Sequence, residues 1–372
     1  MVASLKPADP GDSIHDIETP ALILDLDLFE ENLRRFDRSI VGNNVRVRPH
    51  AKSHKCPAIA RIQIDRGAVG VCCQKTSEAE IMVASGITDI LISNQVVTPK
   101  KILRIVELSK KASVSVLVDN PENVSLINDI ASKHNVRVQV LIELNVGANR
   151  CGVTDDHSLL QLAKSIQNSP FITFIGIHAY QGRAQHVRNK VEREALIRTA
   201  IEKVLHARDL LESLGFSCDY VTGAGTGTYE FEAASGIYSE IQPGSYIFMD
   251  ADYSKNLDEN KKPVSEFLQS LFVLTTVMST TNPKRPIVDA GLKSLSVDSG
   301  LPLVSDSKTM YVGASDEHGV LESPDYTYKI GDTLRLIPGH CDPTVNLYDW
   351  IVCVRGNNVE DTWPILARGA SI

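Results

Sequence analysis

The sequence contains no apolar run of 18 or more residues, the length that a helix needs to cross a membrane. It also lacks a basic segment followed by an apolar one near its start, where MVASLKPADPGDSIHD is polar and contains proline. These absences argue against a membrane protein and against a targeting segment. We therefore expect a soluble, cytoplasmic protein.

Clusters of basic residues are missing as well. The net charge is −8, from 38 lysine and arginine residues against 46 aspartate and glutamate residues. Nucleic-acid binding needs a positively charged surface to meet the phosphates, so this balance argues against a nucleic-acid partner. We expect a small-molecule ligand instead.

An even set of cysteines, which a disulfide framework needs, is also absent. The seven cysteines are odd in number, and several lie in apolar runs such as VGVCCQ. We interpret them as reduced and mostly buried. The adjacent pair Cys72 and Cys73 could suggest metal or redox chemistry. Neighbouring residues of a strand point to opposite faces of a sheet, however, so we interpret both as small core residues.

The chain does contain a repeated alternation of strand-like and helix-like segments. Its 372 residues are 43% hydrophobic, which suits a large α/β barrel and a second, smaller domain. Helical spacing separates most of the strand-like runs, for example in TSEAEIMVASG and PENVSLINDIASKH. The strand-like runs are VRVRPH (45–50), VGVCCQ (69–74), DILISN (89–94), SVSVLVDN (113–120), VRVQVLIEL (136–144), FIGIHAY (174–180), DYVTGAG (219–225) and SEIQPGSYIF (239–248).

Eight strands that alternate with helices fit a TIM-type (β/α)8 barrel. Alternation alone also fits an open doubly wound sheet. Polar groups follow each run, and in a barrel the carboxyl ends of the strands converge on one mouth, which favours the barrel. These groups are His50 and Lys52, Gln74, Asn94, Asp119, Asn145, Tyr180, Gly223 to Thr228 and Gln242.

The last third of the chain is rich in strand-like runs without long helical inserts, as in SLFVLTTVMST and YDWIVCVRG. A small β-rich domain fits this pattern, and the early run ALILDL (21–26) could join it. We therefore predict a barrel over residues 27–260 and a β-rich domain made of residues 1–26 and 261–372.

A lysine stands directly after the first barrel strand. Lys52 lies in RPHAKSHK, close to His54 and Lys55. An ammonium group inside an apolar barrel is costly and often becomes a nucleophile, but a lysine in a loop is more often solvent-exposed. The residue alone leaves both interpretations open.

Two glycine-containing turns follow the last two barrel strands. TGAGTGTY (222–229) and QPGSY (242–246) fall where barrels commonly bind a phosphate through free backbone N–H groups. Either one alone could be only a tight turn. Together they indicate a phosphorylated ligand.

A histidine and an aspartate stand two residues apart near the end of the chain, as His340 and Asp342 in GHCDPT. In an extended segment both side chains point the same way and can meet one cation, with positions left for water or substrate. Two such ligands suit Mg²⁺ or Mn²⁺ better than a closed structural zinc site. The alternative is a plain hydrogen-bonded pair, because an H-x-D triplet often arises by chance.

Ten sequence blocks, taken in order, resemble the D-threonine aldolase group, which includes the 3-hydroxy-D-aspartate aldolases. The resemblance implies an alanine-racemase-type barrel with a C-terminal β-rich domain, pyridoxal 5′-phosphate, a divalent metal and a homodimer. The blocks are RPHAKSHKCP, GVCCQKTSEAE, ISNQVV, NRCGV, AYQG, GAGTGT, ASGIYSEIQPGSYIFMDADY, VDAGLKS, SDEHGV and PGHCDPTVNLYDW.

The resemblance also implies roles for single residues. Lys52 would be the catalytic Schiff-base lysine, and His340 and Asp342 would be the metal ligands, with His340 also catalytic. Gln242 stands where more distant racemases place an arginine beside the pyridine nitrogen. A neutral neighbour does not favour protonation of this nitrogen, so the ring would be a less extreme electron sink. The other implied cofactor-binding residues are His50 and Gln74, Arg150 at the phenolic oxygen, Tyr180 beside the ring, and Thr226, Gly227, Thr228, Gly244 and Ser245 at the phosphate.

The implied activity is a retro-aldol cleavage of a D-β-hydroxy-α-amino acid, which from D-threonine yields glycine and acetaldehyde. A hydroxide on the metal or a nearby histidine would take the hydroxyl proton. A 3-hydroxy-D-aspartate aldolase, and a dehydratase of D-serine or 3-hydroxyaspartate, are alternatives on the same fold. A non-catalytic cofactor carrier would lack the C-terminal domain. The preferred aldehyde-side group, methyl, phenyl or carboxylate, stays open.

Overall fold

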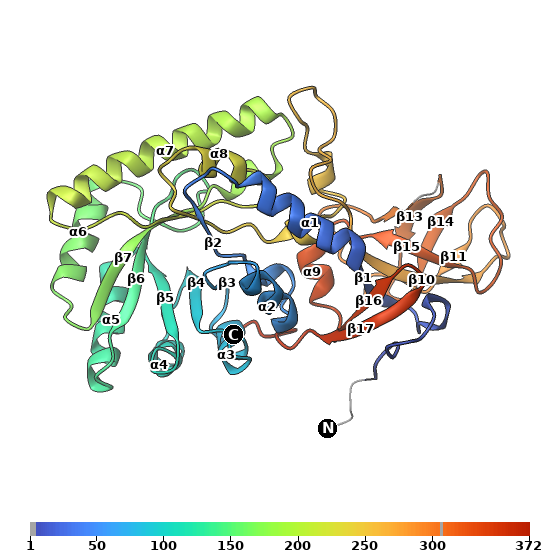
Figure 1. Cartoon of the computed structure of the whole chain (residues 1–372), viewed down its shortest axis with the longest axis horizontal. Helices are drawn as coiled ribbons and strands as arrows, with labels where there is room; N and C mark the ends of the chain where they lie inside the picture. The colour runs from blue at the N-terminus through green and yellow to red at the C-terminus, as the bar shows by residue number, and fades with distance from the viewer. Residues whose placement is uncertain (1–4, 306–307) are drawn as a thin grey trace. The chain divides into compact units, whose positions relative to one another are not determined.

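The computed structural model describes residues 5–305 and 308–372, which divide into two compact units (Figure 1). We call them the barrel unit and the β unit. The domain limits predicted above stay a prediction. The barrel unit comprises Ser39–Lys52, Pro57–Gly244 and Ala370–Ile372, and the β unit comprises the described parts of Met1–Arg38, Ser53–Cys56 and Ser245–Gly369.

Eight parallel strands form the sheet of the barrel unit, in the order β2-β9-β8-β7-β6-β5-β4-β3. The two ends of this sheet meet at a parallel bridge between His50 and Cys72, and Val69 N–H donates to Val47 O beside it. The predicted TIM-type barrel is therefore confirmed over the open sheet. The strands are β2 (Arg46–Val47), β3 (Val71–Cys73), β4 (Asp89–Gln95), β5 (Ser113–Val118), β6 (Val138–Glu143), β7 (Ile172–Ala179), β8 (Val221–Gly223) and β9 (Glu240–Ile241).

The last of these strands is shorter than predicted. The sequence predicted a strand-like run over 239–248, but β9 ends at Ile241 and a 3-10 turn, η4 (Ser245–Ile247), follows. Pro243 lacks the N–H that a central strand donates, and Gly244 lowers strand propensity further. The polar groups after β9 therefore stand on a turn.

Helices cover the outer face of the parallel sheet, where α3 to α7 are seen in Figure 1. Local capping explains several of their starts. Asn120 accepts a hydrogen bond from Glu122 N–H while Pro121 takes the first position of α5, and Asp155 caps α6 by accepting from Ser158 N–H. The helical segments are α2 (Pro57–Asp65), α3 (Thr76–Ala84), α4 (Pro99–Leu108), α5 (Pro121–Lys133), α6 (Asp156–Gln167), η3 (Gly182–His186), α7 (Lys190–Ser213) and α8 (Tyr229–Ala234). None of the described helices combines the length and apolarity that a membrane crossing requires.

Alternate strand residues face two different cores. Cys72 packs inside the barrel with Leu91 and Leu117, whereas Cys73 packs with Ile92 in the layer between the strands and the helices. The two cysteines thus point to opposite faces, as predicted from strand geometry. All seven cysteines are free, and all except the half-buried Cys151 are buried. This confirms the prediction that the cysteines are reduced and mostly buried.

A buried charged cluster surrounds Arg48, which directly follows β2, and its partners Asp89 and Glu240 stand at the amino ends of β4 and β9. Arg48 Nε donates to Glu240 Oε1 at 3.0 Å, and Arg48 Nη1 donates to Asp89 Oδ1 at 2.7 Å. The hydroxyls of Tyr220 and Thr222 donate to the same Glu240 oxygen, at 2.6 and 2.9 Å. In barrels this end contributes stability, while chemistry takes place at the opposite end.

The β unit is built on a second, mostly antiparallel sheet. Its path runs β13-β14-β11-β10-β1-β16-β17, with β15 pairing β10 and β12. The early run ALILDL does join the late strands, because β1 pairs β10 antiparallel and β16 parallel. The elements are η1 (Ile14–Asp16), β1 (Ala21–Asp25), α1 (Leu26–Ser39), η5 (Tyr253–Lys255), β10 (Leu271–Ser279), β11 (Ile287–Val288), β12 (Leu303–Val304), β13 (Met310–Ala314), β14 (Gly319–Glu322), β15 (Thr333–Ile337), α9 (Cys341–Val345), β16 (Trp350–Arg355) and β17 (Asn358–Pro364).

Candidate cofactor and metal sites

Lys52 lies in the 3-10 turn η2 (Ala51–Ser53), which follows β2, and its side chain is exposed. The backbone N–H of Lys52 donates to His50 Nδ1 at 3.3 Å. His50 is buried, and its Nε2 lies 3.0 Å from Ser93 Oγ. Ser93 Oγ also lies 3.4 Å from Gln74 Oε1. The structure thus brings His50 and Gln74 together beside the lysine, at the carboxyl ends of neighbouring strands.

The neighbouring lysine has a different environment. Lys55 belongs to the β unit, is only 8% exposed and has a positive φ of 51°. Its carbonyl accepts a hydrogen bond from Ala367 N–H. Lys52 is therefore the lysine of this pair that stands at a barrel strand end with its side chain exposed.

Arg150 and Tyr180 follow β6 and β7, and they approach each other. The guanidinium carbon of Arg150 lies 5.8 Å from the centroid of the Tyr180 ring, which is within the range of a cation–π contact. The ring in turn lies against two glycines. A Cβ placed on Gly182 or Gly225 would stand 3.0 or 3.2 Å from ring carbons of Tyr180. Glycine therefore lets the aromatic ring approach the TGAGTGT loop, which the sequence predicted to hold the phosphate.

The TGAGTGT loop is held by hydrogen bonds to Gln185. Gly227 N–H donates to Gln185 Oε1 at 2.9 Å, and Gln185 Nε2 donates to Thr228 Oγ1 at 2.8 Å. A Cβ on Gly227 would lie 2.4 Å from the Gln185 carbonyl oxygen, so only glycine fits there. The nearby Thr226 is 8% exposed. A phosphate bound at Gly227 and Thr228 would have to exchange some of these bonds for its own.

A buried carboxyl group supports the same loop. Thr228 Oγ1 donates to Glu232 Oε1 at 2.9 Å, and Glu232 is fully buried. Burial raises the pKa of Glu232 to about 8, against the smaller opposing effect of the Thr228 hydrogen bond. Glu232 is therefore largely protonated and uncharged at neutral pH, and it adds little negative charge beneath a loop predicted to bind an anion.

Gln242, just after β9, belongs to a chain of buried polar groups. Its Nε2 donates to Thr222 Oγ1 at 2.7 Å, and a hydrogen bond joins it to His178. His178 Nδ1 lies 3.7 Å from Glu143 Oε1. Burial lowers the pKa of His178, and this effect exceeds the opposite effect of the Glu143 carboxylate. The imidazole is therefore neutral at pH 7, and Gln242 has an uncharged neighbour on this side.

Three potential metal ligands meet at the carboxyl ends of β5 and β6. The ligand atoms of Asp119, Glu143 and Cys151 lie within 4.8 Å of one another. Gln95 Nε2 donates to both carboxylates, at 3.2 Å to Asp119 and at shorter range to Glu143. Gly152 N–H donates to Asp119 as well, at 2.9 Å. We interpret the group as hydrogen-bonded support for the loop that carries Arg150, because these donors already occupy acceptor positions of both carboxylates.

The predicted metal ligands lie in the β unit, at the start of α9. His340 is the N-cap residue of this helix, with extended backbone angles, and Asp342 lies in its first turn. The expectation that both stand in one extended segment is therefore wrong. Pro343 suits the first turn of a helix because its fixed φ and missing N–H are tolerated there, and the segment coils instead. Strand geometry does not align these two side chains.

Buried hydrogen bonds hold the start of α9 instead. Asp250 is fully buried, and its Oδ2 accepts from Cys341 N–H at 3.0 Å, between the two predicted ligands. Thr344 Oγ1 donates to His340 O at 2.8 Å. Ser245, predicted at the phosphate, belongs to the β unit here, and its Oγ donates to Asp342 Oδ1 at 3.5 Å. The preceding residue, Gly244, closes the main segment of the barrel unit and is buried.

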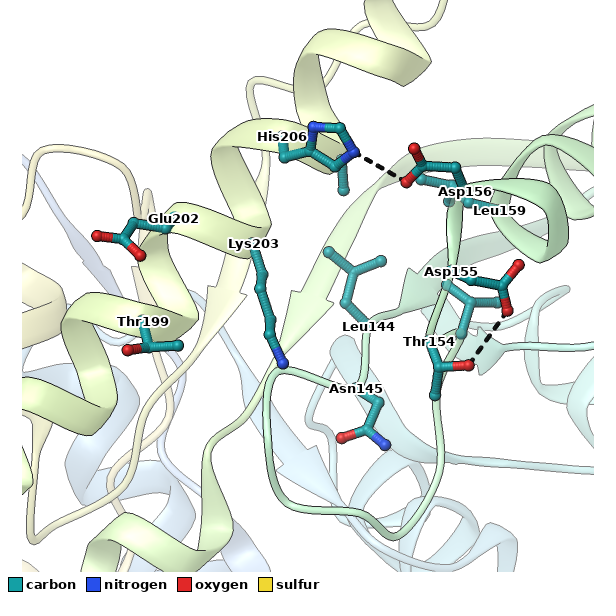
Figure 2. Close-up of a pocket in the computed structure, with 12 residues that line it drawn as sticks. Leu144, Asn145, Thr154, Asp155, Asp156, Leu159, Thr199, Glu202, Lys203 and His206 are labelled. Carbon is teal, nitrogen blue, oxygen red and sulfur yellow. Dashed lines mark hydrogen bonds and ion pairs between the residues drawn. The ribbon is translucent and has the colours of Figure 1, made fainter.

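The barrel unit contains a separate cavity of about 350 Å³, between the loop after β6 and helices α6 and α7. Figure 2 shows residues that line this cavity. Lys203 extends toward it from α7, and His206 pairs with Asp156 at 2.8 Å on its rim. Its lining includes none of the predicted cofactor or metal residues.

Sequence reasoning missed several of the polar groups that support the candidate sites. His178 and Glu143 lie within apolar strands, where the alternation of strand residues offered a weak signal. Gln185 and Asp298 lie far along the chain from the residues they contact, and no local pattern indicates their partners.

Known protein families match both parts of the chain. The family described as "Alanine racemase, N-terminal domain" matches residues 24–252, and a serine dehydratase domain family matches residues 270–354. Together with the barrel, these matches define an enzyme class that has the alanine-racemase fold and a β-rich second part.

Individual proteins match over nearly the full chain. A 3-hydroxy-D-aspartate aldolase of Paracoccus denitrificans (strain Pd 1222) is 46% identical, over 98% of this chain and 95% of its own. A D-threonine aldolase of an Arthrobacter species is also 46% identical, over 100% and 98%. The crystal structure of a D-threonine aldolase from Filomicrobium marinum superposes with a TM-score of 0.95 and 42% identity, over 99% and 100%. A D-threo-3-hydroxyaspartate dehydratase of Delftia sp. (strain HT23) is 25% identical, over 95% and 98%. The chain belongs to the D-threonine aldolase and 3-hydroxy-D-aspartate aldolase family.

Proposed function

We propose that this protein cleaves the Cα–Cβ bond of D-configured β-hydroxy-α-amino acids, with D-threonine giving glycine and acetaldehyde. The observation that carries the proposal is the 46% identity, over essentially the whole chain, to aldolases of this kind. The enzyme is thus a carbon–carbon lyase, as the sequence predicted. A homodimer remains part of the proposal, and light scattering on the purified protein would test it.

The residues of the barrel mouth fit pyridoxal 5′-phosphate, which the family implies. They offer an exposed lysine after the first strand, an aromatic ring against a glycine-rich loop, and a guanidinium over that ring. When bound, the cofactor accepts the electron pair that the broken Cα–Cβ bond releases. Lys52 would hold it covalently, and the 226–228 loop would bind its phosphate through backbone and hydroxyl donors.

The neighbours of the predicted cofactor residues would set its charge state. Arg150 carries a permanent positive charge and would stabilise an anionic phenolic oxygen. Gln242 carries none, and the buried His178 beside it is neutral because burial lowers the pKa of its imidazole. This pair therefore offers no negative charge that would stabilise a proton on the pyridine nitrogen. His50, fixed by Ser93, would keep the turn that carries Lys52 in place.

His340 and Asp342 supply the donor set that a catalytic divalent ion takes. One imidazole and one carboxylate leave coordination positions for water or substrate, which suits Mn²⁺ or Mg²⁺. Such an ion would act as a Lewis acid for the substrate β-hydroxyl. Asp250 and Thr344 would keep the two ligands in place through the backbone of residues 340 and 341.

The aldolase of 3-hydroxy-D-aspartate, which would release glycine and glyoxylate, is the second candidate. It is favoured by an equally high identity of 46% to a protein of that name. The named dehydratase relative shares only 25% identity, and a non-catalytic cofactor carrier would have no need of the β unit.

Product analysis tests this proposal. Full-length protein supplied with pyridoxal 5′-phosphate and Mn²⁺ is incubated with D-threonine or 3-hydroxy-D-aspartate, with the L-enantiomers as controls. We expect equal amounts of glycine and aldehyde from a D-substrate, and loss of activity with a chelator. Ammonia and a 2-oxo acid would identify a dehydratase and contradict the proposal, and activity that persists after chelation would contradict the metal assignment.

A further inference from the structure

The β unit contains a histidine and aspartate pair that several further hydrogen bonds hold in place. His340 Nδ1 lies 2.8 Å from Asp298 Oδ2, although the two residues are 42 positions apart in the chain. The side chain of His340 is 30% exposed and that of Asp298 is 51% exposed. At such exposure an isolated ion pair contributes little to stability, so stability alone is a weak reason for this arrangement.

Asp298 is held in place by its own neighbours. Ser296 Oγ donates to its Oδ1 at 2.7 Å, and Ser299 Oγ donates to its Oδ2 at 3.2 Å. The two serine hydroxyls thus fix the orientation of the carboxylate that meets His340.

These contacts close into a ring that returns to the histidine. Ser296 N–H donates to Thr344 Oγ1 at 3.1 Å, and the Thr344 hydroxyl donates to the carbonyl of His340 at 2.8 Å. A further bond, from Tyr348 Oη to Ser294 O at 2.6 Å, joins the same two segments. The backbone and the imidazole of His340 are thus fixed by one connected set of hydrogen bonds.

We propose that Asp298 is a positioning residue that holds His340 as the Nδ1–H tautomer, with Nε2 directed to a divalent cation. A neutral imidazole has one protonated and one free nitrogen, and an acceptor at Nδ1 leaves the Nε2 lone pair for the ion. Histidine ligands commonly donate their second N–H to a carboxylate, which orients the ring and raises its basicity. This inference rests on the proposed function only through the assignment of His340 as a metal ligand.

A second histidine and aspartate pair in this protein serves as a matched control. His206 Nε2 lies 2.8 Å from Asp156 Oδ1, the same separation, but both side chains are exposed, at 66% and 60% (Figure 2). Among the described residues, neither side chain makes a further hydrogen bond. Both residues belong to the barrel unit, whereas the predicted metal ligands belong to the β unit. The pair therefore serves as an ordinary surface pair with the same separation between nitrogen and oxygen, and shows how much such a pair contributes to Mn²⁺ binding.

The test is a Mn²⁺ titration of full-length protein, with free Mn²⁺ measured by electron paramagnetic resonance. We expect Asp298→Ala to weaken Mn²⁺ binding about 10- to 100-fold. Asp298→Asn should weaken it less, because the amide oxygen still accepts from Nδ1–H but carries no charge. Asp156→Ala should bind Mn²⁺ as the wild type does. Thermal unfolding without metal checks that each variant is folded, and a misfolded Asp298→Ala leaves Asp298→Asn to decide.

A second readout does not depend on metal or on activity. In histidine-labelled, metal-free protein, ¹⁵N chemical shifts should show His340 protonated at Nδ1, and Asp298→Ala should move the population toward Nε2–H. Wild-type affinity and an unchanged tautomer in folded Asp298→Ala, with binding lost in His340→Ala, would overturn this inference and leave the metal assignment intact. Wild-type affinity in His340→Ala would overturn both.

Discussion

The barrel unit and the β unit position their candidate functional groups by different means. In the barrel, Lys52, Arg150 and Tyr180 follow the carboxyl ends of parallel strands, so the sheet itself sets where they stand. In the β unit, His340 and Asp342 belong to a helix of five residues and the N-cap before it, and hydrogen bonds from separate segments fix them.

This difference suggests where each unit tolerates change. In the barrel, the acidic partners of Arg48 stand at the amino ends of β4 and β9, whereas Lys52 follows the carboxyl end of β2. Stability and chemistry are thereby separated. In the β unit the same hydrogen bonds both support the fold and orient the predicted ligands. Substitutions should therefore separate activity from stability in the barrel more cleanly than in the β unit.

The largest effect is expected for Lys52→Ala. It should remove the visible absorbance of bound pyridoxal phosphate and lower activity by about 10³-fold or more, roughly 4 kcal/mol, because the covalent link to the cofactor is lost. Thermal stability of the cofactor-free protein should not change, because the side chain is exposed. Lys203→Ala, at the separate cavity, should behave as wild type in both measurements (Figure 2).

Arg48→Met tests the opposite end of the barrel. Glu240 would remain fully buried without its cation, which typically costs about 3–5 kcal/mol. We expect urea denaturation to show this loss while the folded fraction still binds pyridoxal phosphate. Glu107→Gln, which removes an exposed ion pair with Lys110, should leave the midpoint unchanged. If Arg48→Met is as stable as the wild type, the buried charged cluster does not contribute to stability, and the proposed separation of stability from chemistry in the barrel is wrong.

His340→Ala should lower activity by about 100-fold, roughly 3 kcal/mol, because the Lewis acid is lost. A chelator should have no further effect on this variant, whereas it should inactivate the wild type. The visible absorbance of the cofactor should persist, since all the predicted cofactor residues except Ser245 lie in the barrel unit. His206→Ala is the control, and equal activity losses in the two histidine variants would argue against a metal role for His340.

The smallest effect concerns pH. The pKa of Glu232 is raised from 4.5 to about 8, so the folded state holds a proton that the unfolded state has released between these values. Its contribution to stability is present below about pH 4.5 and is lost as the pH rises through about 8. Glu232→Gln should reduce this decline by on the order of 1 kcal/mol, measured as the difference in Tm between pH 5 and pH 8. Glu230→Gln is the exposed control. If the decline in Tm between pH 5 and pH 8 is the same in Glu232→Gln as in the wild type, Glu232 does not cause this decline.

Much of the fold could be predicted because its signals are local. Apolar runs and helical spacing identified the parallel strands, and the run ALILDL was predicted to join the late strands, as β1 does. Two predictions were wrong, the length of the strand at β9 and the extended segment at His340. The proline and glycine of QPGSY and the proline of HCDPT favour turns, which an analysis of periodicity overlooks.

The supporting contacts could not be predicted, because they depend on the folded chain. Asp298 meets His340 across 42 positions of the chain, and Gln185 meets Gly227 across the same separation. No pattern in either segment identifies the partner. The resemblance to known aldolases named the principal residues, but only the folded structure reveals which other groups hold them.

The most direct test of the account is to locate the cofactor lysine. Purified full-length protein loaded with pyridoxal phosphate is reduced with borohydride, which converts the link between cofactor and lysine into a stable bond, and the digest is mapped by mass spectrometry. We predict a phosphopyridoxyl group on Lys52, the exposed lysine after β2. Modification of the buried Lys55, or of no lysine, would contradict the account.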